Sequence, residues 1–281
     1  MNRLIKRITF VLFVIGIIIT AVIMNTAPAD EYTVTYIDVG QGDSAVVSGD
    51  NTNILIDAGT DKNARKVKIA LDRLKIKTLD LVVLSHLDSD HISGMSELIK
   101  SYKVKKVITG KIGKEYLPGS PSLDELEVAL DLNKIPFSMV KAGDKLKLNN
   151  IWLSVLSPNM EYGESNEDSA VVMLNCGKNK LLFTGDISSK VEKNLLDKNI
   201  GADFLKVSHH GSFQATGEEF LNAVNPSYAV VSVSQFNTYN LPNVEVMKRL
   251  YGYGCKVFRT DEMGSITFHI NGNGVKYECE K

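Results

Sequence analysis

Residues 85–91 of this 281-residue chain read Ser85-His86-Leu87-Asp88-Ser89-Asp90-His91, and they directly follow the apolar run Leu79-Asp80-Leu81-Val82-Val83-Leu84. The apolar run predicts a strand, from about Leu79 to Ser85, that ends in a loop rich in ligand groups. Imidazole nitrogen and carboxylate oxygen are the groups that Zn, Mn and Fe accept, so the loop predicts a metal site. The alternative is a polar turn in which Asp90 caps a helix that begins near Ser93.

Two later stretches repeat this pattern, in which an apolar run ends in polar residues beside glycine. They are Thr184-Gly185-Asp186 and Ser208-His209-His210-Gly211-Ser212. Four of the five histidines therefore follow expected strands, whereas His269 lies inside one and is expected to be structural. The coincidence favours one shared metal site over three unrelated turns. Asp38, Asp43 and Asp57 also end expected strands, where they either form turns or orient the imidazoles without touching the metal.

The rest of the chain predicts an α/β protein built from two similar halves, each with strands first and alternating helices and strands afterwards. We therefore expect two sheets that face one another, with helices outside. The expected strands are 32–39, 44–48, 53–57, 79–85, 104–109, 151–156, 170–174, 180–184, 204–208, 228–233, 256–259, 265–270 and 275–279; the expected helices are 61–74, 93–100, 123–132, 191–198, 218–224 and 244–251, and 110–122 is an expected loop.

An apolar segment without charge, residues 8–24, precedes the globular part and follows Arg3, Lys6 and Arg7. A membrane span needs about 17–25 apolar residues and a signal-peptide core about 7–15, so this segment fits either. Its length favours an anchor, while Ala27-Pro28-Ala29 offers a cleavage site after Ala29. The basic residues before the segment predict that residues 30–281 lie outside the cytoplasm, either at the cell membrane or secreted.

Composition excludes some classes of protein. The chain is 44% hydrophobic and 23% charged, which is ordinary for a globular domain, and its formal net charge is −1. The strongly basic surface of many nucleic-acid binders is therefore absent. Three cysteines without metal-knuckle spacing cannot complete a disulfide framework, and Cys176 and Cys255 are expected to be small core residues.

Taken together, these motifs resemble the metallo-β-lactamase superfamily, whose signature is a His-x-His-x-Asp-His loop, a later Gly-Asp and further histidines. More narrowly they look like the extracytoplasmic hydrolase domain of ComEC/Rec2-type competence proteins. The stretches that carry this resemblance are Asp38-Val39-Gly40-Gln41-Gly42-Asp43-Ser44, Leu55-Ile56-Asp57-Ala58-Gly59, the 86–91 loop, Leu182-Phe183-Thr184-Gly185-Asp186 and His209-His210-Gly211-Ser212. The resemblance implies a four-layer αβ/βα sandwich over residues 30–281, here as a stand-alone domain behind residues 1–29.

The resemblance also implies a ligand set for one or two divalent ions, Zn or Mn. One metal would be held by His86, Asp88 and His209, the other by Asp90 and His91, with Asp186 as the bridge. Asp90 and His210 are the expected catalytic residues, and Ser212 is a further candidate to assist a phosphoryl oxygen or leaving group.

Two departures from the family pattern weaken the expected site. Asp88 stands where the superfamily loop has its second histidine. Leu241 stands where relatives commonly carry a histidine, so the second metal site is expected to be weaker or altered.

Three functions remain open from the sequence. The first is a metal-dependent hydrolase that cleaves a phosphodiester, with DNA as the implied substrate, by means of metal-activated water. The second is hydrolysis of a cell-surface phosphodiester or ester, such as a phosphorylcholine-like group. The third is a degenerate metal- or ligand-binding module that has lost catalysis through Leu241.

Overall fold

The computed structural model describes residue 13 and residues 31–111 and 120–281, and two mixed sheets form its centre. The eight-stranded sheet has the order β17-β16-β1-β2-β3-β5-β7-β8, and the seven-stranded sheet has the order β15-β14-β13-β12-β11-β10-β9. The first sheet consists of β1 (Tyr32–Tyr36), β2 (Ala45–Gly49), β3 (Thr52–Ile56), β5 (Leu81–Leu84), β7 (Val107–Thr109), β8 (Phe137–Met139), β16 (Ile266–Asn271) and β17 (Gly274–Cys279). The second consists of β9 (Lys145–Leu148), β10 (Ile151–Ser157), β11 (Val171–Cys176), β12 (Asn179–Phe183), β13 (Phe204–Lys206), β14 (Tyr228–Val231) and β15 (Lys256–Arg259).

Each sheet is antiparallel on one side and parallel on the other. In the first sheet β3, β5, β7 and β8 run parallel, and in the second β12, β13, β14 and β15 do. A short pair, β4 (Thr78–Leu79) and β6 (Lys103–Val104), lies beside them. Parallel strands need crossover connections, and these supply the outer helices.

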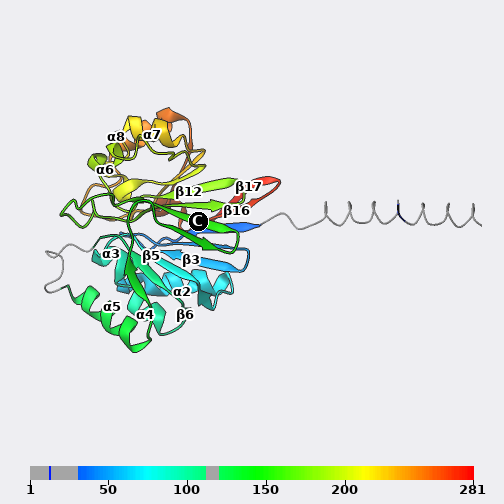
Figure 1. The fold of residues 1–281 in the computed structure, drawn as a ribbon. Coiled ribbons are helices and arrows are strands. Elements are labelled where there is room, and N and C mark those ends of the chain that lie inside the picture. Colours follow the sequence, from blue (N-terminus) through cyan, green and yellow to red (C-terminus); the bar gives the residue numbers. More distant parts are fainter. Residues whose placement is uncertain (1–12, 14–30, 112–119) are drawn as a thin grey trace, which may run out of the picture.

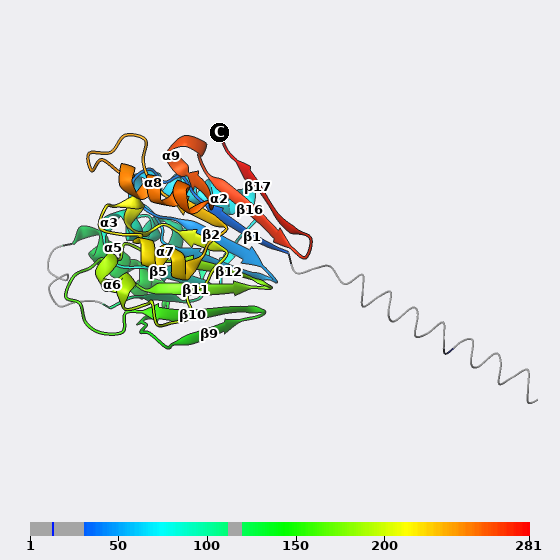
Figure 2. The same cartoon turned by 90° about the horizontal axis from the view of Figure 1, so that it is seen from above.

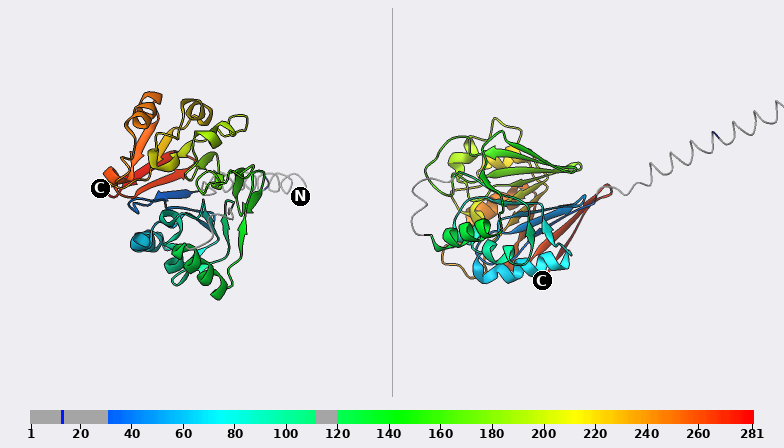
Figure 3. Two further views of the ribbon diagram at one scale, coloured as in Figure 1. Left: turned by 90° about the vertical axis from the view of Figure 1, so that its left-hand side faces the viewer. Right: turned by 60° about the horizontal axis from the view of Figure 1, so that its bottom comes forward.

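Helices cover the outer face of each sheet, so the order of layers is helix, sheet, sheet, helix. Figure 1 shows α2, α4 and α5 below the first sheet and α6, α7 and α8 above the second, and the left view of Figure 3 shows the same arrangement from the side. The helices are η1 (Asp61–Asn63), α2 (Ala64–Arg73), α3 (Ser89–Ile92), α4 (Met95–Ile99), α5 (Pro121–Leu132), α6 (Ser189–Lys193), η3 (Ser208–Gly211), α7 (Glu218–Val224), α8 (Val244–Tyr253) and α9 (Thr260–Met263).

Alternation along the strands explains why the chain needs three hydrophobic cores. In β5, Leu81 and Val83 face the core between the sheets, whereas Val82 and Leu84 face the helices outside. In β13, Phe204 faces the central core and Leu205 the outer one. Successive strand residues point to opposite faces, so a sheet covered on both sides must be apolar at consecutive positions.

The predicted α/β plan with two facing sheets is confirmed, and several element boundaries differ from the prediction. The expected strand 79–85 is interrupted at Asp80, which separates β4 from β5. The Asp80 carboxylate accepts the backbone N–H of Asn53. The expected helix at 93–100 is wrong in its start, because α3 begins at Ser89 and α4 follows at Met95. Strands β8 and β9 had no predicted counterpart.

The C-terminal strands join the first sheet rather than the second. β16 pairs with β1, at the side of the molecule opposite β9 in Figure 2. The predicted apolar segment 8–24 lies, apart from residue 13, outside the described residues, and the boundary after residue 29 stays a prediction. None of the helices in the described part combines the length and the apolar character needed to cross a membrane.

Candidate metal centre

The predicted ligand residues follow three parallel strands of the two sheets. His86 follows β5, Asp186 follows β12, and His209 and His210 follow β13. The carboxyl ends of parallel strands share one edge of a sheet, and the two sheets face each other, so residues far apart in sequence meet there. His86, His91 and Asp186 each offer a ligand atom within 4.8 Å of the others, and so do Asp90, His91 and His210.

The inner part of the centre consists of buried side chains with unpartnered ligand atoms. His86 Nε2, His91 Nε2, His210 Nε2 and Asp186 Oδ1 have no hydrogen-bond partner among the described residues. His91 Nε2 lies 3.5 Å and His210 Nε2 3.3 Å from Asp186 Oδ2. A buried polar atom without a partner is costly. Unpartnered ligand atoms gathered in these overlapping groups fit a cation, and imidazole with carboxylate suits Zn or Mn.

Asp57 fixes the orientation of the imidazole of His91. Its carboxylate accepts the backbone N–H of Ser85 at 2.7 Å and the Ser85 hydroxyl at 2.9 Å, and it lies 3.0 Å from His91 Nδ1. The Ser85 hydroxyl also lies 3.0 Å from His86 Nδ1. The Nε2 atoms of both rings are thereby left to face the centre. Of the two roles open for Asp57, the structure shows the one that orients an imidazole.

His210 is held from behind by different partners. Its Nδ1 donates to the carbonyl of Ser232 at 2.8 Å and lies 3.6 Å from Asp43 Oδ1. Asp43 in turn lies 2.6 Å from the ammonium of Lys206, and both side chains are buried. The buried charge of Lys206 keeps the Asp43 carboxylate in place, so the Nε2 atom of His210 points to Asp186 and Asp90.

The histidine turn has a backbone that few residues other than glycine adopt. His209, His210 and Gly211 have φ values of 48°, 53° and 80°. Left-handed conformations cost free energy for non-glycine residues and persist where the surroundings impose them. Here Glu192 contributes by accepting the backbone N–H groups of Thr216 and Gly217 beyond the turn. The strained backbone is therefore that of the turn that orients the imidazoles of His209 and His210.

The rim of the centre is more exposed. Asp88, Asp90 and His209 have side-chain exposures of 45%, 32% and 30%. Asp88 Oδ2 lies 3.7 Å from His86 Nε2, and His209 Nε2 lies 3.8 Å from Asp186 Oδ2. The structure thus brings all six predicted ligands and His210 to one place. The division of these residues between two ions and their catalytic roles stay predictions.

The alternative in which Asp90 caps a helix is wrong, because α3 begins at Ser89 and Asp90 lies in its first turn. Asp88 occupies the position before the helix, and its side chain makes no capping hydrogen bond. The backbone of Asp90 packs instead against Gly42, where an added Cβ would lie 2.3 Å from the Asp90 carbonyl oxygen. The glycine at position 42 therefore allows the close approach of the two loops.

The charged groups of the centre shift one another's pKa values. Burial alone would lower the pKa of His91 and His210, but the carboxylates around them prevail: the pKa of His91 is well above its usual range and that of His210 is about 10. Burial alone would raise the pKa of Asp186, but His210 and His91 hold it well below its usual range. For His86, burial and then the charge of His91 lower the pKa. Of His86, His91 and His210, His86 is therefore the one most readily neutral and able to bind a metal.

An open cleft of about 680 Å³ leads from solvent to the centre. Asp88, Asp90 and Asp186 lie at its base, and Phe213, Tyr239 and Leu241 form part of its wall. Leu241 packs against the outer core of the second sheet. Leu241, which stands where relatives commonly carry a histidine, therefore forms part of the cleft wall and offers no ligand atom.

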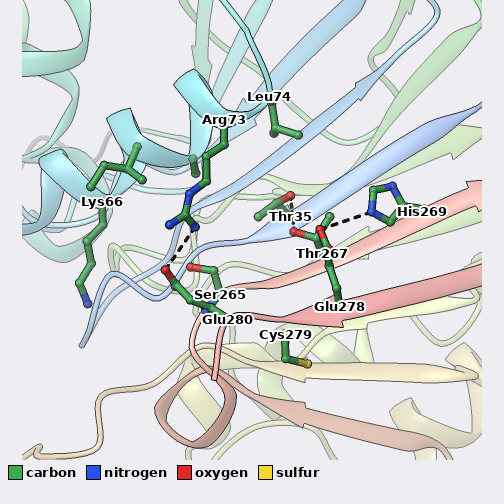
Figure 4. Close-up of a pocket in the computed structure, with 12 residues that line it drawn as sticks. Thr35, Lys66, Arg73, Leu74, Ser265, Thr267, His269, Glu278, Cys279 and Glu280 are labelled. Atoms are coloured by element: carbon green, nitrogen blue, oxygen red, sulfur yellow. Dashed lines mark hydrogen bonds and ion pairs between the residues drawn. The ribbon is translucent and has the colours of Figure 1, made fainter.

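A second cavity, of about 610 Å³, lies between α2 and strands β16 and β17 (Figure 4). Its charged residues are already paired: Arg73 lies 3.2 Å from Glu280, His269 lies 3.6 Å from Glu278, and Lys66 lies 3.4 Å from Asp38 outside the cavity. The fifth histidine is therefore away from the metal centre, as expected. This cavity has no set of unpartnered ligand atoms comparable to the cleft among the described residues.

Several residues of the site were missed in the sequence, although one of them, Lys206, did give a signal. A lysine inside the otherwise apolar strand β13 was a usable sign that Lys206 is paired with a buried acid. The Ser232 carbonyl gives no signal, because every residue has a backbone carbonyl. Ser165, whose hydroxyl donates to Asp88 Oδ1 at 2.5 Å, and its neighbour Asn166 lie in a polar loop without a motif.

The fold and the assembled His/Asp site define the class of this protein as a metallo-β-lactamase-fold protein with a candidate metal centre. Residues 37–235 match the family model described as "Metallo-beta-lactamase superfamily", and the chain belongs to that superfamily. Among solved structures, the metallo-β-lactamase fold protein YhfI from Bacillus subtilis is similar with a TM-score of 0.59 and 13% identity, covering 85% of this chain and 99% of that one. At this identity the likeness shows the fold alone.

Curated relatives are similar over most of the chain. "ComE operon protein 3" of Bacillus subtilis is 32% identical over 85% of this chain and 33% of the relative. "Competence protein ComA" of Neisseria gonorrhoeae is 32% identical over 90% and 34%, and "Recombination protein 2" of Haemophilus influenzae is 30% identical over 93% and 32%. The predicted resemblance to competence proteins is confirmed. The chain spans about a third of the length of these relatives.

Proposed function

We propose that this chain is a phosphodiesterase that cleaves DNA outside the cytoplasm with the help of one or two divalent ions, Zn or Mn. The observation that carries the proposal is a pair of overlapping clusters beside an open cleft: His86, His91 and Asp186 in one, and Asp90, His91 and His210 in the other, each with its ligand atoms within 4.8 Å of one another. Divalent ions held by these residues would supply Lewis-acid polarisation of a phosphoryl oxygen and activation of water.

Side chains of this protein would hold the metal, orient its imidazole ligands and transfer protons. His86, His91 and Asp186 would hold the metal, and Asp57 and Asp43 keep the imidazoles in position. Asp90 Oδ2 and His210 Nε2 lie 3.5 Å apart beside the proposed metal ligands, where these side chains can pass a proton to the leaving oxygen. Burial of the inner residues limits water around these groups and strengthens their electrostatic effect.

DNA is proposed as the substrate because two relatives are named as competence proteins or products of a competence-type operon and a third as a recombination protein. The exposed rings of Phe213 and Tyr239 in the cleft wall also suit a substrate with flat bases. Export is proposed from the apolar segment 8–24 and the basic residues before it. Protease treatment of intact cells, followed by detection of the globular part, tests this location.

A hydrolase of a cell-surface phosphodiester or ester is the second candidate, and one observation favours it. Among the described residues that line the cleft there is no lysine or arginine, whereas three are aspartates. Proteins that bind nucleic acid generally place basic side chains along the phosphate backbone. A small substrate that carries its own positive group would suit this acidic entrance.

The experiment is an assay of the purified full-length chain, stripped of metal and reloaded with Mn²⁺ or Zn²⁺. Linear single- and double-stranded DNA, bis-p-nitrophenyl phosphate and a choline phosphodiester are compared, with Asp186→Asn as the inactive control. Metal-dependent cleavage of DNA is expected. Turnover of the small esters without cleavage of DNA would leave the second candidate, and failure to bind metal would support a degenerate binding module.

A further inference from the structure

The loop between β10 and β11 places an amide side chain beside the metal centre. Asn166 lines the cleft together with Asp88, Asp90, Asp186 and His209. The preceding residue, Ser165, donates its hydroxyl to Asp88 Oδ1 at 2.5 Å. The loop therefore reaches the centre beside Asp88.

Hydrogen bonds from backbone N–H groups hold this loop in place. The Asp168 carboxylate accepts the N–H groups of Tyr162 and Gly163 at 2.9 and 3.1 Å. The N–H of Ala170 donates to the carbonyl of Ser85 at 2.7 Å, which joins the loop to the ligand loop itself. Movement of Asn166 away from the centre would break these contacts, so its side chain is presented in a defined position.

The two oxygens of Asn166 differ in their partners. Its backbone carbonyl accepts the hydroxyl of Ser169 at 2.6 Å, whereas its side-chain Oδ1 is buried and has no hydrogen-bond partner among the described residues. A buried amide oxygen without a hydrogen-bond partner is destabilising. The carboxylates that share the cleft can only accept hydrogen bonds when they are ionised, so none of them can satisfy this oxygen.

A cation between these acceptors resolves the conflict. Resting on the proposed metal-dependent function, we propose that Asn166 Oδ1 is a metal ligand on the His86–Asp88 side of the centre. The amide oxygen adds to the carboxylate of Asp88, so this side is richer in oxygen than in nitrogen. Oxygen ligands suit Mn²⁺, whereas Zn²⁺ in proteins is bound mostly through nitrogen and sulfur. An amide oxygen at this position therefore narrows the advantage of Zn²⁺ over Mn²⁺ compared with a histidine at the same position.

The test measures metal binding and does not depend on activity. The full-length chain is stripped with a chelator and titrated with MnCl₂ or ZnCl₂ by isothermal titration calorimetry. Asn166→Leu removes the oxygen at similar volume and is expected to weaken Mn²⁺ binding about tenfold or more. Asn166→Asp keeps an oxygen and should retain Mn²⁺ binding, and Asn166→His supplies nitrogen and should shift the preference toward Zn²⁺.

Two control variants separate this inference from the function on which it rests. Asn159→Leu makes the same change on an exposed residue of the same loop and should leave both affinities unchanged. His86→Ala should lose metal binding. If His86→Ala loses binding while Asn166→Leu binds Mn²⁺ as the unmodified chain does, the role of Asn166 is overturned and the metal centre stands. If the unmodified chain binds neither ion, both proposals fail.

Discussion

The inner and outer parts of the metal centre are built differently, although the same loop contributes to both. In the inner part every imidazole has a partner behind it: Ser85 behind His86, Asp57 behind His91 and the Ser232 carbonyl behind His210. In the outer part, Asp88 has the hydroxyl of Ser165, and both Asp88 and His209 are partly open to solvent.

The difference indicates a division of labour. Ligands whose orientation is fixed before the metal arrives lose little conformational freedom on binding it, so the inner part should supply most of the affinity. The outer part lines the cleft, where substrate and water must enter. Substitutions in the two parts should therefore differ in size, and the predictions below test that order.

The largest effect is expected at Asp186, which faces both His91 and His210. Asp186→Ala should weaken metal binding by more than about 100-fold and abolish hydrolysis, because it leaves the two imidazoles without the anion between them. Calorimetric titration with Mn²⁺ and Zn²⁺ measures the change. Asp131→Ala, an exposed carboxylate of α5, is the control. Metal binding at the original strength in Asp186→Ala would refute the proposed centre.

Asp57 should have the next largest effect although it is not a predicted ligand. Asp57→Asn removes the carboxylate that fixes His91 and receives the Ser85 N–H, and a loss of about 10- to 100-fold in metal affinity is expected. Thermal unfolding of the variant shows whether the fold is kept. If affinity is unchanged in a folded variant, pre-orientation of His91 contributes nothing and the contrast between the two parts disappears.

Metal binding should strengthen as the pH rises. His210, with a pKa of about 10, is protonated at neutral pH in the metal-free protein, and a cation bound beside it would favour loss of that proton. Affinity should increase by up to about tenfold per pH unit for each proton released, until the pH reaches that pKa. Calorimetry in two buffers of different ionisation enthalpy counts the protons, and a count of zero would contradict the charge state inferred for His210.

The same pKa predicts how the metal-free protein responds to pH. The folded-state pKa of His210 lies above the unfolded-state value of about 6.5, so protonation of His210 stabilises the fold. This stabilisation is fully present below a pH of about 6.5 and is lost as the pH rises through about 10. Thermal unfolding of the stripped protein between pH 6 and 10 should therefore show a falling midpoint. Bound metal should weaken this dependence, because a neighbouring cation lowers the pKa of the imidazole in the folded state.

The smallest effect is expected at the rim. Asp88→Ala should weaken metal binding by about tenfold or less, since the side chain is half exposed and held by one hydroxyl. Comparison with His86→Ala under the same conditions gives the contrast directly. If Asp88→Ala proves as damaging as His86→Ala, exposure does not distinguish the two parts of the centre.

Much of the fold could be predicted because the strands are apolar at consecutive positions and the helices between them are amphipathic. Helix α7 has the predicted bounds, and α8 begins where predicted. Strand β9 was missed because its alternating Lys145-Leu146-Lys147-Leu148 is short and half exposed, and β8 because it has only three residues. The start of α3 was missed because its ligand residues are polar and hide the helical pattern.

The sequence by itself determined which side chains could bind a metal, since His86, His91, Asp186 and His210 stand out as imidazoles and carboxylates at the ends of apolar runs. Only the tertiary structure decided how each is held. Lys206 behind Asp43, the Ser232 carbonyl behind His210 and the buried oxygen of Asn166 depend on contacts between segments far apart in the chain. The physical reason is that local sequence governs strand and loop formation, whereas a hydrogen-bond partner across two sheets is set by their packing.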